Sequence, residues 1–317
     1  MKTMDNKNYH GLLAVNKEVG PTSHDTLDEL RNILKYKKIG HIGTLDPGAS
    51  GVLVFCLGDA LKTVQFLVDW DKEYLAKIKL GEITDTYDAQ GIIIKKTNNL
   101  KLDGEKIKET VLSFKEQCWQ TPPLYSAIKY KGKKLYQYAR KKEEIEVRKR
   151  RVEIKEIEVK EIKLPYIVIK VTCSKGTYIR SLAYDIGEKL GCGAHLFSLC
   201  RTRVGPFELK DVYELEEVKR ATNGNGILRI LVPWEQVLGN LPAIVVTEEF
   251  KTQIKNGPEL KREDIISIEK GFSPREKIGL KDREGTILAI GESLVSSEDL
   301  WRLDGKEKVF QYRRVLV

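Results

Sequence analysis

A glycine-rich stretch between two apolar segments sets the first limit on the fold. Residues 40–55 read GHIGTLDPGASGVLVF, with four glycines and one proline around a single carboxylate, Asp46. Glycine allows close backbone approaches that other residues resist, and proline stiffens the segment directly after the carboxylate. The apolar run VLVFCL follows at once and predicts a buried strand. The pattern therefore predicts a tightly shaped loop held at the end of a strand.

The segments around this loop indicate an α+β fold. Residues 11–36 contain a short strand and then a helix, which Thr22 and Asp25 are expected to cap. Residues 73–80 alternate like a strand, with Tyr74 on the inward face. Further helices are expected at about 59–68, 103–117 and 177–190, and further strands at 152–162 and 166–173. Because strands and helices do not alternate regularly, a doubly wound sheet is disfavoured.

The length and the last third of the chain predict a second domain. A chain of 317 residues favours two domains over one. The composition changes near residues 223–242, where NGNG is followed by VPWEQVLGNLP. Beyond this point, short apolar segments separated by turn signals such as Asn256–Gly257 predict a small β-barrel. We therefore expect one domain of residues 1–239 and a second of residues 240–317.

The positive charge is concentrated in one segment. The formal net charge is +9, yet residues 240–317 hold 14 basic and 14 acidic residues. Residues 129–151 hold 11 basic residues against 3 acidic ones, interleaved with Tyr130, Tyr136 and Tyr138. Such a segment suits a phosphate backbone whose bases stack on aromatic rings. A solvated helix face has a similar composition, so both readings stay open from composition alone.

The sequence carries no sign of a membrane-bound or secreted protein. No apolar run approaches the ~20 residues that span a bilayer. The first ten residues lack the apolar centre of a signal peptide. The five cysteines are odd in number and contain no C-x-x-C pair, which is typical of a reducing compartment. We therefore expect a cytoplasmic protein without a membrane partner, and a monomer by default.

The familiar cofactor motifs are missing, which leaves Asp46 as the candidate for chemistry. The sequence has no phosphate-loop or dinucleotide fingerprint, so no nucleotide cofactor is expected. Cys192, His195 and Cys200 lack a nearby fourth ligand, so no metal is expected. A carboxylate can act as a nucleophile toward a sugar or an activated carbon without either. From the loop alone, Asp46 could equally be a turn cap, since Asp-Pro is a common turn former.

Five segments of the chain resemble the motifs of one enzyme family, in that family's order. They are NKEVGPTSHD, GHIGTLDPGASGVL, KEYLAKIKLGEITDTYDAQG, PPLYSAIKYKGKKLYQYAR and CSKGTYIRSLAYDIGEKLGCGAHLFSLCRTRVGPF. Together they resemble the TruB family of tRNA pseudouridine synthases, and residues 240–317 are similar to the PUA-type RNA-binding barrel. Gly48 and Ser50 stand where the family usually has a larger apolar residue and a threonine.

The resemblance implies a fold and a reaction. The implied fold is α+β, a mixed and largely antiparallel sheet flanked by helices, followed by a small PUA-like β-barrel. The implied reaction converts the uridine at position 55, in the T loop of tRNA, to pseudouridine without a cofactor. The uracil is detached from its ribose and rejoined through carbon, after the base is flipped out of the folded loop. Attack on the sugar, attack on the base and elimination stay open as mechanisms.

The resemblance also implies the catalytic residues. Asp46 matches the family's nucleophile. Tyr74 matches the tyrosine that stacks on the target base and takes part in proton transfer. Arg180 matches the arginine that pairs with the aspartate and keeps it ionised and oriented. By pattern alone, Tyr74 would be a core residue and Arg180 an edge residue of its helix.

Substrate-binding roles are implied for His41, Asp88, Leu199, Lys129 and Lys131. Leu199 is expected to pack on the flipped uracil, while Asp88 could contact the RNA or cap the turn at Gly91. Residues 119–150 resemble the insertion with which stand-alone members grip the T arm of tRNA. Two alternatives keep the same scaffold: a guide-RNA-dependent synthase, and a non-catalytic protein that binds or folds tRNA. A metal-dependent nuclease is a third alternative.

Overall fold

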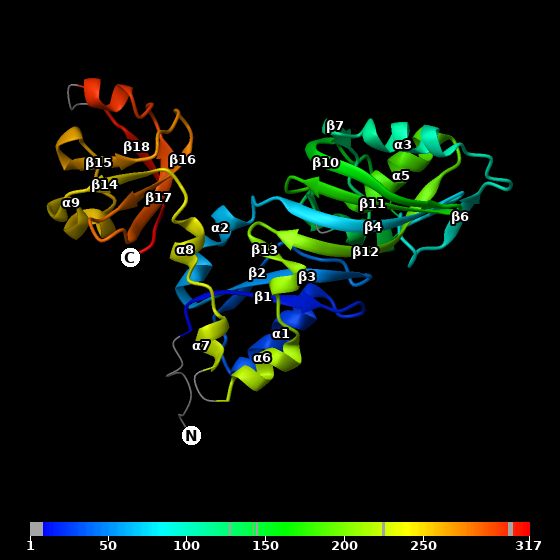
Figure 1. Ribbon diagram of the computed structural model, residues 1–317, viewed down its shortest axis with the longest axis horizontal. Coiled ribbons are helices and arrows are strands. Elements are labelled where there is room, and N and C mark those ends of the chain that lie inside the picture. Colours follow the sequence, from blue (N-terminus) through cyan, green and yellow to red (C-terminus); the bar gives the residue numbers. More distant parts are fainter. Residues whose placement is uncertain (1–8, 127, 142, 144, 224–225, 304–306) are drawn as a thin grey trace.

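The chain folds into two β-sheet units joined by short helices (Figure 1). The computed structural model describes residues 9–126, 128–141, 143, 145–223, 226–303 and 307–317. The strands are β1 (Gly11–Lys17), β2 (Ile39–Ile42), β3 (Ala49–Leu57), β4 (Lys72–Leu80), β5 (Glu82–Thr84), β6 (Ile93–Lys96), β7 (Glu116–Gln120), β8 (Lys129–Tyr130), β9 (Lys133–Lys134), β10 (Arg150–Lys163), β11 (Tyr166–Cys173), β12 (Ala194–Val204), β13 (Phe207–Glu208), β14 (Ala243–Val246), β15 (Ile265–Glu269), β16 (Lys277–Lys281), β17 (Ile287–Ser293) and β18 (Phe310–Val315). The α-helices are α1 (Ser23–Leu34), α2 (Val64–Leu67), α3 (Gly104–Leu112), α4 (Leu135–Arg140), α5 (Ile179–Leu190), α6 (Leu215–Ala221), α7 (Gly226–Ile230), α8 (Trp234–Leu238) and α9 (Glu248–Gln253).

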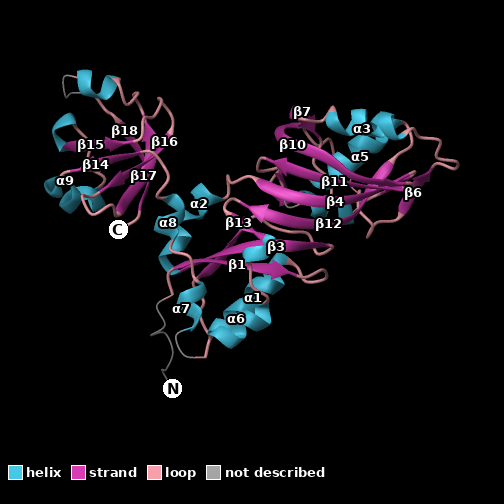
Figure 2. Cartoon of the chain, viewed as in Figure 1, coloured by secondary structure: helices cyan, strands magenta, loops and turns pink. Residues whose placement is uncertain are grey.

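The larger sheet is mixed and largely antiparallel, as the sequence predicted. Its order is β1-β3-β12-β4-β11-β10-β7, with β2 paired to β3 and β13 paired to β12. Every pair in it is antiparallel except β3 with β12, which run parallel. Helices α3 and α5 cover one part of the sheet and α1 and α6 another, so the strands lie between helices (Figure 2). The α+β fold class is therefore confirmed.

Local sequence rules explain the helices that frame the sheet. Helix α1 begins after Thr22, whose hydroxyl accepts from the backbone of Asp25 while the Asp25 carboxylate accepts from the backbone of Thr22. Helix α5 ends at Gly191, whose φ of 76° is the left-handed conformation that glycine adopts easily. Both helices bury an apolar stripe against the sheet. The capping pair and the glycine cap are confirmed.

Two helix boundaries differ from the sequence prediction. The segment expected as one helix at about 59–68 is a 3-10 helix over Gly58–Thr63 followed by the short α2. The helix expected over 103–117 ends at Leu112, and the chain turns into edge strand β7. Strand β7 is fixed by its ladder with β10, a partner about 30 residues away that helical periodicity does not reveal.

The segment implied to grip RNA connects two neighbouring strands. Strands β7 and β10 pair directly, so residues 121–149 form one long excursion from the sheet. Within it, the hairpin of β8 and β9 leads into α4, and Leu135 is its buried apolar anchor. The excursion is therefore a separate feature that the sheet holds at both ends.

The C-terminal unit is a five-stranded sheet in the order β15-β14-β16-β17-β18. Strand β15 was not predicted, because Ile266 and Ser267 face solvent and weaken the apolar pattern. Helix α9 was not predicted either, because it is short and buries only Phe250. Among the described residues no ladder joins β15 to β18, so the unit is described as a sheet. It has its own apolar core, which includes Phe250, Leu280 and Phe310.

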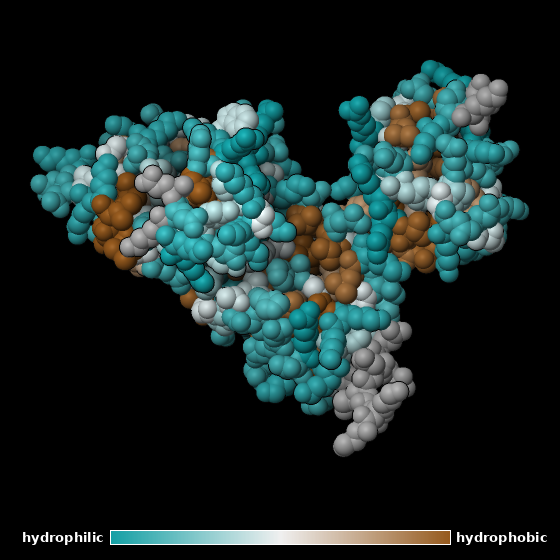
Figure 3. Space-filling view, turned by 180° about the vertical axis from the view of Figure 1, so that it is seen from behind, coloured by the Kyte–Doolittle hydropathy of each residue, from teal (hydrophilic) through white to brown (hydrophobic). Residues whose placement is uncertain are grey.

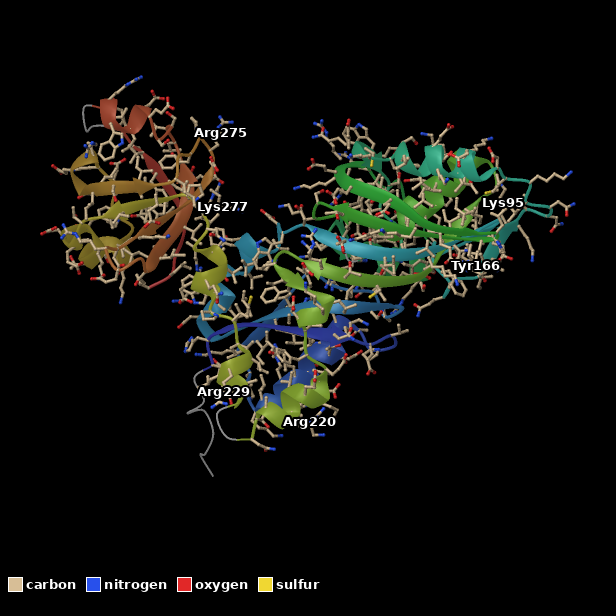
Figure 4. The ribbon with its side chains drawn as sticks, viewed as in Figure 1. Lys95, Tyr166, Arg220, Arg229, Arg275 and Lys277 are labelled. Carbon is tan, nitrogen blue, oxygen red and sulfur yellow. The ribbon has the colours of Figure 1, made fainter. Side chains whose placement is uncertain are left out.

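The two units share an apolar contact. Phe66 and Leu67 of α2, with Trp234 and Leu238 of α8, belong to the same buried cluster as three C-terminal residues, Ile287, Ile290 and Leu316. Figure 3 shows the two parts as lobes with apolar surface near their junction. Lys277 of β16 lies on the side of the smaller lobe that faces the larger sheet (Figure 4), and its Nζ is 3.2 Å from Asp69. The segment that leads into β4 is therefore in contact with the C-terminal unit.

Gly51 tests how tightly the sheet is built around the glycine-rich loop. Its φ is +107°, and a Cβ there would lie 2.2 Å from the carbonyl oxygen of Arg201. We expect Gly51→Ala to lower the free energy of unfolding by about 3 kcal/mol or more, from backbone strain and the clash together. Thermal and urea denaturation measure this loss.

Gly48→Ala is the matched control for that substitution. A Cβ at Gly48 would meet only the flexible side chain of Gln90, at 3.3 Å. This variant should therefore keep nearly the stability of the parent. Equal loss of stability in the two variants would contradict the role assigned to Gly51.

Candidate active site

The loop between β2 and β3 presents Asp46 and is held from three directions. Ser23, the first residue of α1, exchanges hydrogen bonds with the backbone of Leu45, at 2.8 and 2.9 Å. The Gly20 amide donates to the carbonyl of Pro47 at 2.8 Å. The Ala49 amide donates to the carbonyl of Asp46 at 3.0 Å and closes a turn. These bonds fix the backbone on both sides of Asp46, from which the carboxylate projects.

After Ser23 and Gly20, the third support from outside the loop is a buried guanidinium. Arg201 on β12 is 1% exposed. Its Nε donates to the carbonyl of Val52 at 2.8 Å, and its Nη2 donates to the carbonyl of Gly43 at 3.1 Å. The positive φ of Gly43, 73°, turns that carbonyl within reach. Arg201 is distant in sequence from the loop, yet its one side chain holds the backbone at both ends of it.

Asp46 and Arg180 form an ion pair, as the resemblance implied. Arg180 is the second residue of α5, and its Nε lies 2.9 Å from Oδ2 of Asp46. The guanidinium is fixed elsewhere as well: Nη2 donates to the carbonyl of Tyr125 at 3.0 Å, and Nη1 lies 3.5 Å from Oδ2 of Asp88. The Arg180 side chain is 6% exposed and that of Asp46 is 46% exposed. The arginine is therefore the rigid partner, and the carboxylate keeps an accessible side.

The pKa of Asp46 is raised, because the effect of partial burial is larger than the opposite effect of Arg180. Removal from water raises the pKa of this carboxyl above its usual value, and the nearby charge of Asp88 raises it further. Arg180 and, more weakly, Lys17 oppose the rise without reversing it. Arg180 thus lowers the pKa of Asp46, as expected for a partner that favours the ionised form, but this effect is smaller than the rise caused by burial and Asp88.

Asp46 lines a cavity of about 300 Å³ together with Tyr74, Leu199 and the loop before α5. Tyr74 lies on β4 opposite Arg201 of β12, and burial raises the pKa of its phenol. Leu199 on β12 pairs with Ala49, the residue that follows the loop. The structure therefore brings four of the implied residues together: Asp46, Tyr74, Arg180 and Leu199.

Asp88 lies on the other side of the ion pair. A smaller cavity of about 60 Å³ is lined by Asp46, Asp88, Arg180 and Leu199, among others. One carboxylate oxygen of Asp88 accepts from the Thr86 hydroxyl at 2.7 Å and from the Gln90 amide at 3.0 Å. The other oxygen faces Arg180. Asp88 therefore shapes its turn and also takes part in the charge cluster.

Three implied residues lie away from these cavities. His41 is on β2, where its ring meets the edge of Phe55, and burial lowers the pKa of its imidazole. Lys129 on β8 and Lys131 in the following turn are exposed in the excursion between β7 and β10. Any contact they make with a substrate is thus outside the cavity of Asp46. A separate hollow of about 480 Å³ is formed by Tyr136, Tyr138 and their basic neighbours around α4.

Sequence reasoning missed three buried cations near the loop. Lys17 at the end of β1 donates to the carbonyl of Ala49 at 2.8 Å, and burial lowers the pKa of its ammonium. Arg201 holds the loop as described above, and Lys72 lines the larger cavity. A signal was present, because each cation occupies an inward position of a strand and lies within one of the five motif segments.

Comparison with known proteins agrees with this geometry. Residues 31–179 match the N-terminal domain of TruB family pseudouridylate synthase, and residues 180–239 match the tRNA pseudouridylate synthase B C-terminal domain. A protein from Clostridium tetani called tRNA pseudouridine synthase B is 44% identical over 81% of this chain and 88% of its own. A Geobacter sulfurreducens protein of the same name is 36% identical over 93% of this chain and 96% of its own.

Solved structures agree as well. A chain in the crystal structure of a Cbf5-Nop10-Gar1 complex matches with a TM-score of 0.78 and 26% identity, over 97% of this chain and 85% of that chain. The fold, the ion pair and these matches define an enzyme, an isomerase of the pseudouridine synthase class. The chain belongs to the TruB family of these enzymes.

The described part of the chain offers neither a membrane-spanning helix nor a metal-binding cluster. No helix in it is both long and apolar enough to cross a membrane. No group of three or more His, Cys, Asp or Glu side chains in it could hold a metal ion. His195, which lies near Cys192 and Cys200 in the sequence, is buried, and its Nδ1 is hydrogen-bonded to the carbonyl of Glu82 at 3.0 Å.

The charge of Asp88 offers a test of the electrostatic balance at Asp46. Asp88→Asn removes a like charge and keeps an oxygen that accepts from Thr86 and Gln90, so we expect the pKa of the Asp46 carboxyl to fall. Titration of the ¹³C carboxyl signal of Asp46 measures this. Asp59→Asn, a surface change outside the cavities, should leave the titration unaltered. An unchanged or higher pKa in Asp88→Asn would contradict the proposed balance.

Proposed function

We propose that this enzyme converts a uridine of tRNA to pseudouridine, and that the uridine is the one at position 55 in the T loop. The observation that carries the proposal is the Asp46–Arg180 pair, 2.9 Å apart, in a cavity that also holds Tyr74 and Leu199. The relatives called tRNA pseudouridine synthase B support tRNA as the substrate class. We further infer that the enzyme works in the cytoplasm as a monomer.

In this proposal Asp46 is the nucleophile and Arg180 positions it. The guanidinium is held by Tyr125 and Asp88, so it fixes one carboxylate oxygen and leaves the exposed side of Asp46 for the nucleoside. Tyr74 forms a wall on which the uracil stacks and is placed to act in proton transfer. Leu199 supplies the apolar contact for the other face of the base. Asp88 supports the cluster from behind, and His41 contacts RNA outside the cavity.

The remaining segments supply affinity for the RNA. The excursion that contains Lys129, Lys131 and α4 carries exposed cations and tyrosines, a combination that suits the phosphates and bases of a T arm. We assign residues 1–239 to the catalytic domain and residues 240–317 to a PUA-like RNA-binding domain. No nucleotide cofactor or metal enters the proposed reaction.

A guide-RNA-dependent reaction is the second candidate, and one observation favours it. A solved structure described as an H/ACA RNP bound to a substrate RNA matches this chain with a TM-score of 0.75 and 25% identity. The higher identity to the stand-alone relatives favours direct action on tRNA. A bare T-arm stem-loop distinguishes the two, because a guide-dependent enzyme would not act on it alone.

Replacement of the nucleophile tests the proposed chemistry. Wild type should release tritium from a T-arm stem-loop labelled at uracil C5, without any added cofactor. Asp46→Asn should lower the rate by a factor on the order of 10⁴ or more and leave RNA binding nearly unchanged. Tight binding with no release by wild type would instead support the guide-dependent or non-catalytic alternatives. Release by Asp46→Asn at the wild-type rate would rule out the nucleophile.

Salt dependence tests the proposed contacts of the excursion. Each phosphate contact steepens the fall of affinity with salt, so Lys129→Ala combined with Lys131→Ala should reduce the slope of log K against log salt by about 1 to 2. Fluorescence anisotropy with a labelled stem-loop at several salt concentrations gives this slope. Lys101→Ala combined with Lys106→Ala removes two exposed lysines, one before α3 and one on it, and should leave the slope unchanged. Equal slopes for the two double variants would contradict the contact.

A further inference from the structure

The cavity that holds Tyr74 carries an excess of positive charge. Its charged lining consists of Asp46, Lys72, Lys175, Arg180 and Arg201. Arg180 pairs with Asp46, and Lys175 pairs with Asp69 at 2.5 Å. Lys72 and Arg201 have no carboxylate within ion-pair distance among the described residues. Arg201 donates to the carbonyls of Gly43 and Val52 and so supports the loop. Lys72 makes no such bond to the loop, so its positive charge needs another explanation.

Lys72 is buried and lines this cavity. It is the first residue of β4, on the same face of the strand as Tyr74, and is 6% exposed. Its Nζ donates to the carbonyl of Val68 at 2.7 Å and to the carbonyl of Trp70. A lysine ammonium has three N–H donors, and the described residues provide no acceptor for the third. The side chain packs beside Gly43, where a Cβ would lie 3.7 Å from Cε of Lys72.

The surroundings make the charged form of Lys72 costly in the absence of an anion. Burial is the main cause that lowers the pKa of Lys72 to about 8, and the positive charge of Arg201 contributes to the same shift. Cys173, Asp69 and Asp71 oppose this shift. An anion that enters the cavity would favour the ammonium and so bind most tightly below this pKa.

A second feature of the cavity also attracts anions. The loop of residues 174–178 lines it and leads into α5, a helix of 12 residues. Helix α5 has no side-chain cap at Tyr178 and no acidic residue in its first turn. The partial positive charge of this helix end is therefore left without a carboxylate of its own turn. Lys72 and the start of α5 line the same space.

We propose that Lys72 and the N-terminal end of α5 form an anion subsite that holds a phosphate of the RNA strand next to the nucleotide entering the cavity. The inference rests on the proposed function, because it takes RNA as the substrate. Lys72 acts through this phosphate as a positioning residue: it holds the strand while Asp46 reaches the nucleoside. A phosphodiester carries a full negative charge in the ground state, so the subsite contributes to binding.

Binding measured against pH tests the subsite. All variants are made in the Asp46→Asn background, so that a T-arm stem-loop binds without turnover. For the parent, Kd should rise about tenfold between pH 7 and pH 9 as Lys72 loses its proton. Lys72→Met should bind about tenfold more weakly at pH 7 and show no such step. Lys72→Arg keeps a charge that does not titrate in this range, so the step should also be absent. Lys77→Met, on the outer face of the same strand, should behave as the parent does.

A chemical change in the RNA identifies the contacted group. Stem-loops carry one uncharged methylphosphonate linkage, on the 5′ or the 3′ side of the target uridine. One of these should weaken binding to the parent about tenfold at pH 7 and leave binding to Lys72→Met unchanged. Two results would overturn the phosphate contact: a methylphosphonate that weakens binding to Lys72→Met as much as to the parent, or no loss of binding at either linkage. Lys72 would then contact the uracil or only support the backbone of Val68 and Trp70.

The outcomes separate this inference from the proposed function. If wild type releases no tritium, the proposed function fails whatever Lys72 does. If wild type is active but parent binding is flat across pH 7 to 9, only the subsite is wrong. Thermal denaturation of each variant confirms that it is folded at the temperature of measurement. The methylphosphonate experiment on the parent stays decisive even if Lys72→Met does not fold.

Discussion

The parallel pairing of β3 with β12 is the constraint on which the candidate active site depends. The pairing sets Ala49 opposite Leu199 and Gly51 opposite Arg201. Strand β12 also pairs with β4 and places Tyr74 opposite Arg201. The loop that precedes β3 therefore meets Tyr74 and Leu199 through a single register. A shift by one residue would turn these side chains to the other face of the sheet and separate Asp46 from them.

Local pattern predicted much of the fold, and long-range contacts account for most of what it missed. The α1 cap, the Gly191 cap and the inward face of β4 depend on neighbours within a few residues, and all three are confirmed. Strand β7 depends on a ladder with β10, which no local pattern shows. The site divides in the same way: Asp46, Tyr74 and Arg180 were identified by resemblance to a family, and periodicity alone would have placed Tyr74 in the core.

The electrostatics of the site show why residue types alone do not define it. The sequence places an arginine where it can pair with Asp46, and that pair forms. The same fold partly buries the carboxyl and brings Asp88 to the other side of the arginine, and both effects raise the pKa of Asp46. One guanidinium thus serves two carboxylates. Arg180 therefore orients the Asp46 carboxylate, while its charge offsets only part of the rise in the pKa of that carboxyl.

The glycines of the loop and the buried Arg201 beneath it depend on each other. Arg201 reaches the carbonyl of Val52 because Gly51 has no Cβ to occupy the space beside the Arg201 backbone. At Gly43 the positive φ of 73°, which glycine adopts easily, turns the carbonyl toward the guanidinium of Arg201. Arg201 can stay buried without a carboxylate because loop carbonyls accept its hydrogen bonds. A lone aspartate lies in so glycine-rich a loop because the loop must close over the buried guanidinium of Arg201, and the bonds of Arg201 to the loop in turn fix where the aspartate lies.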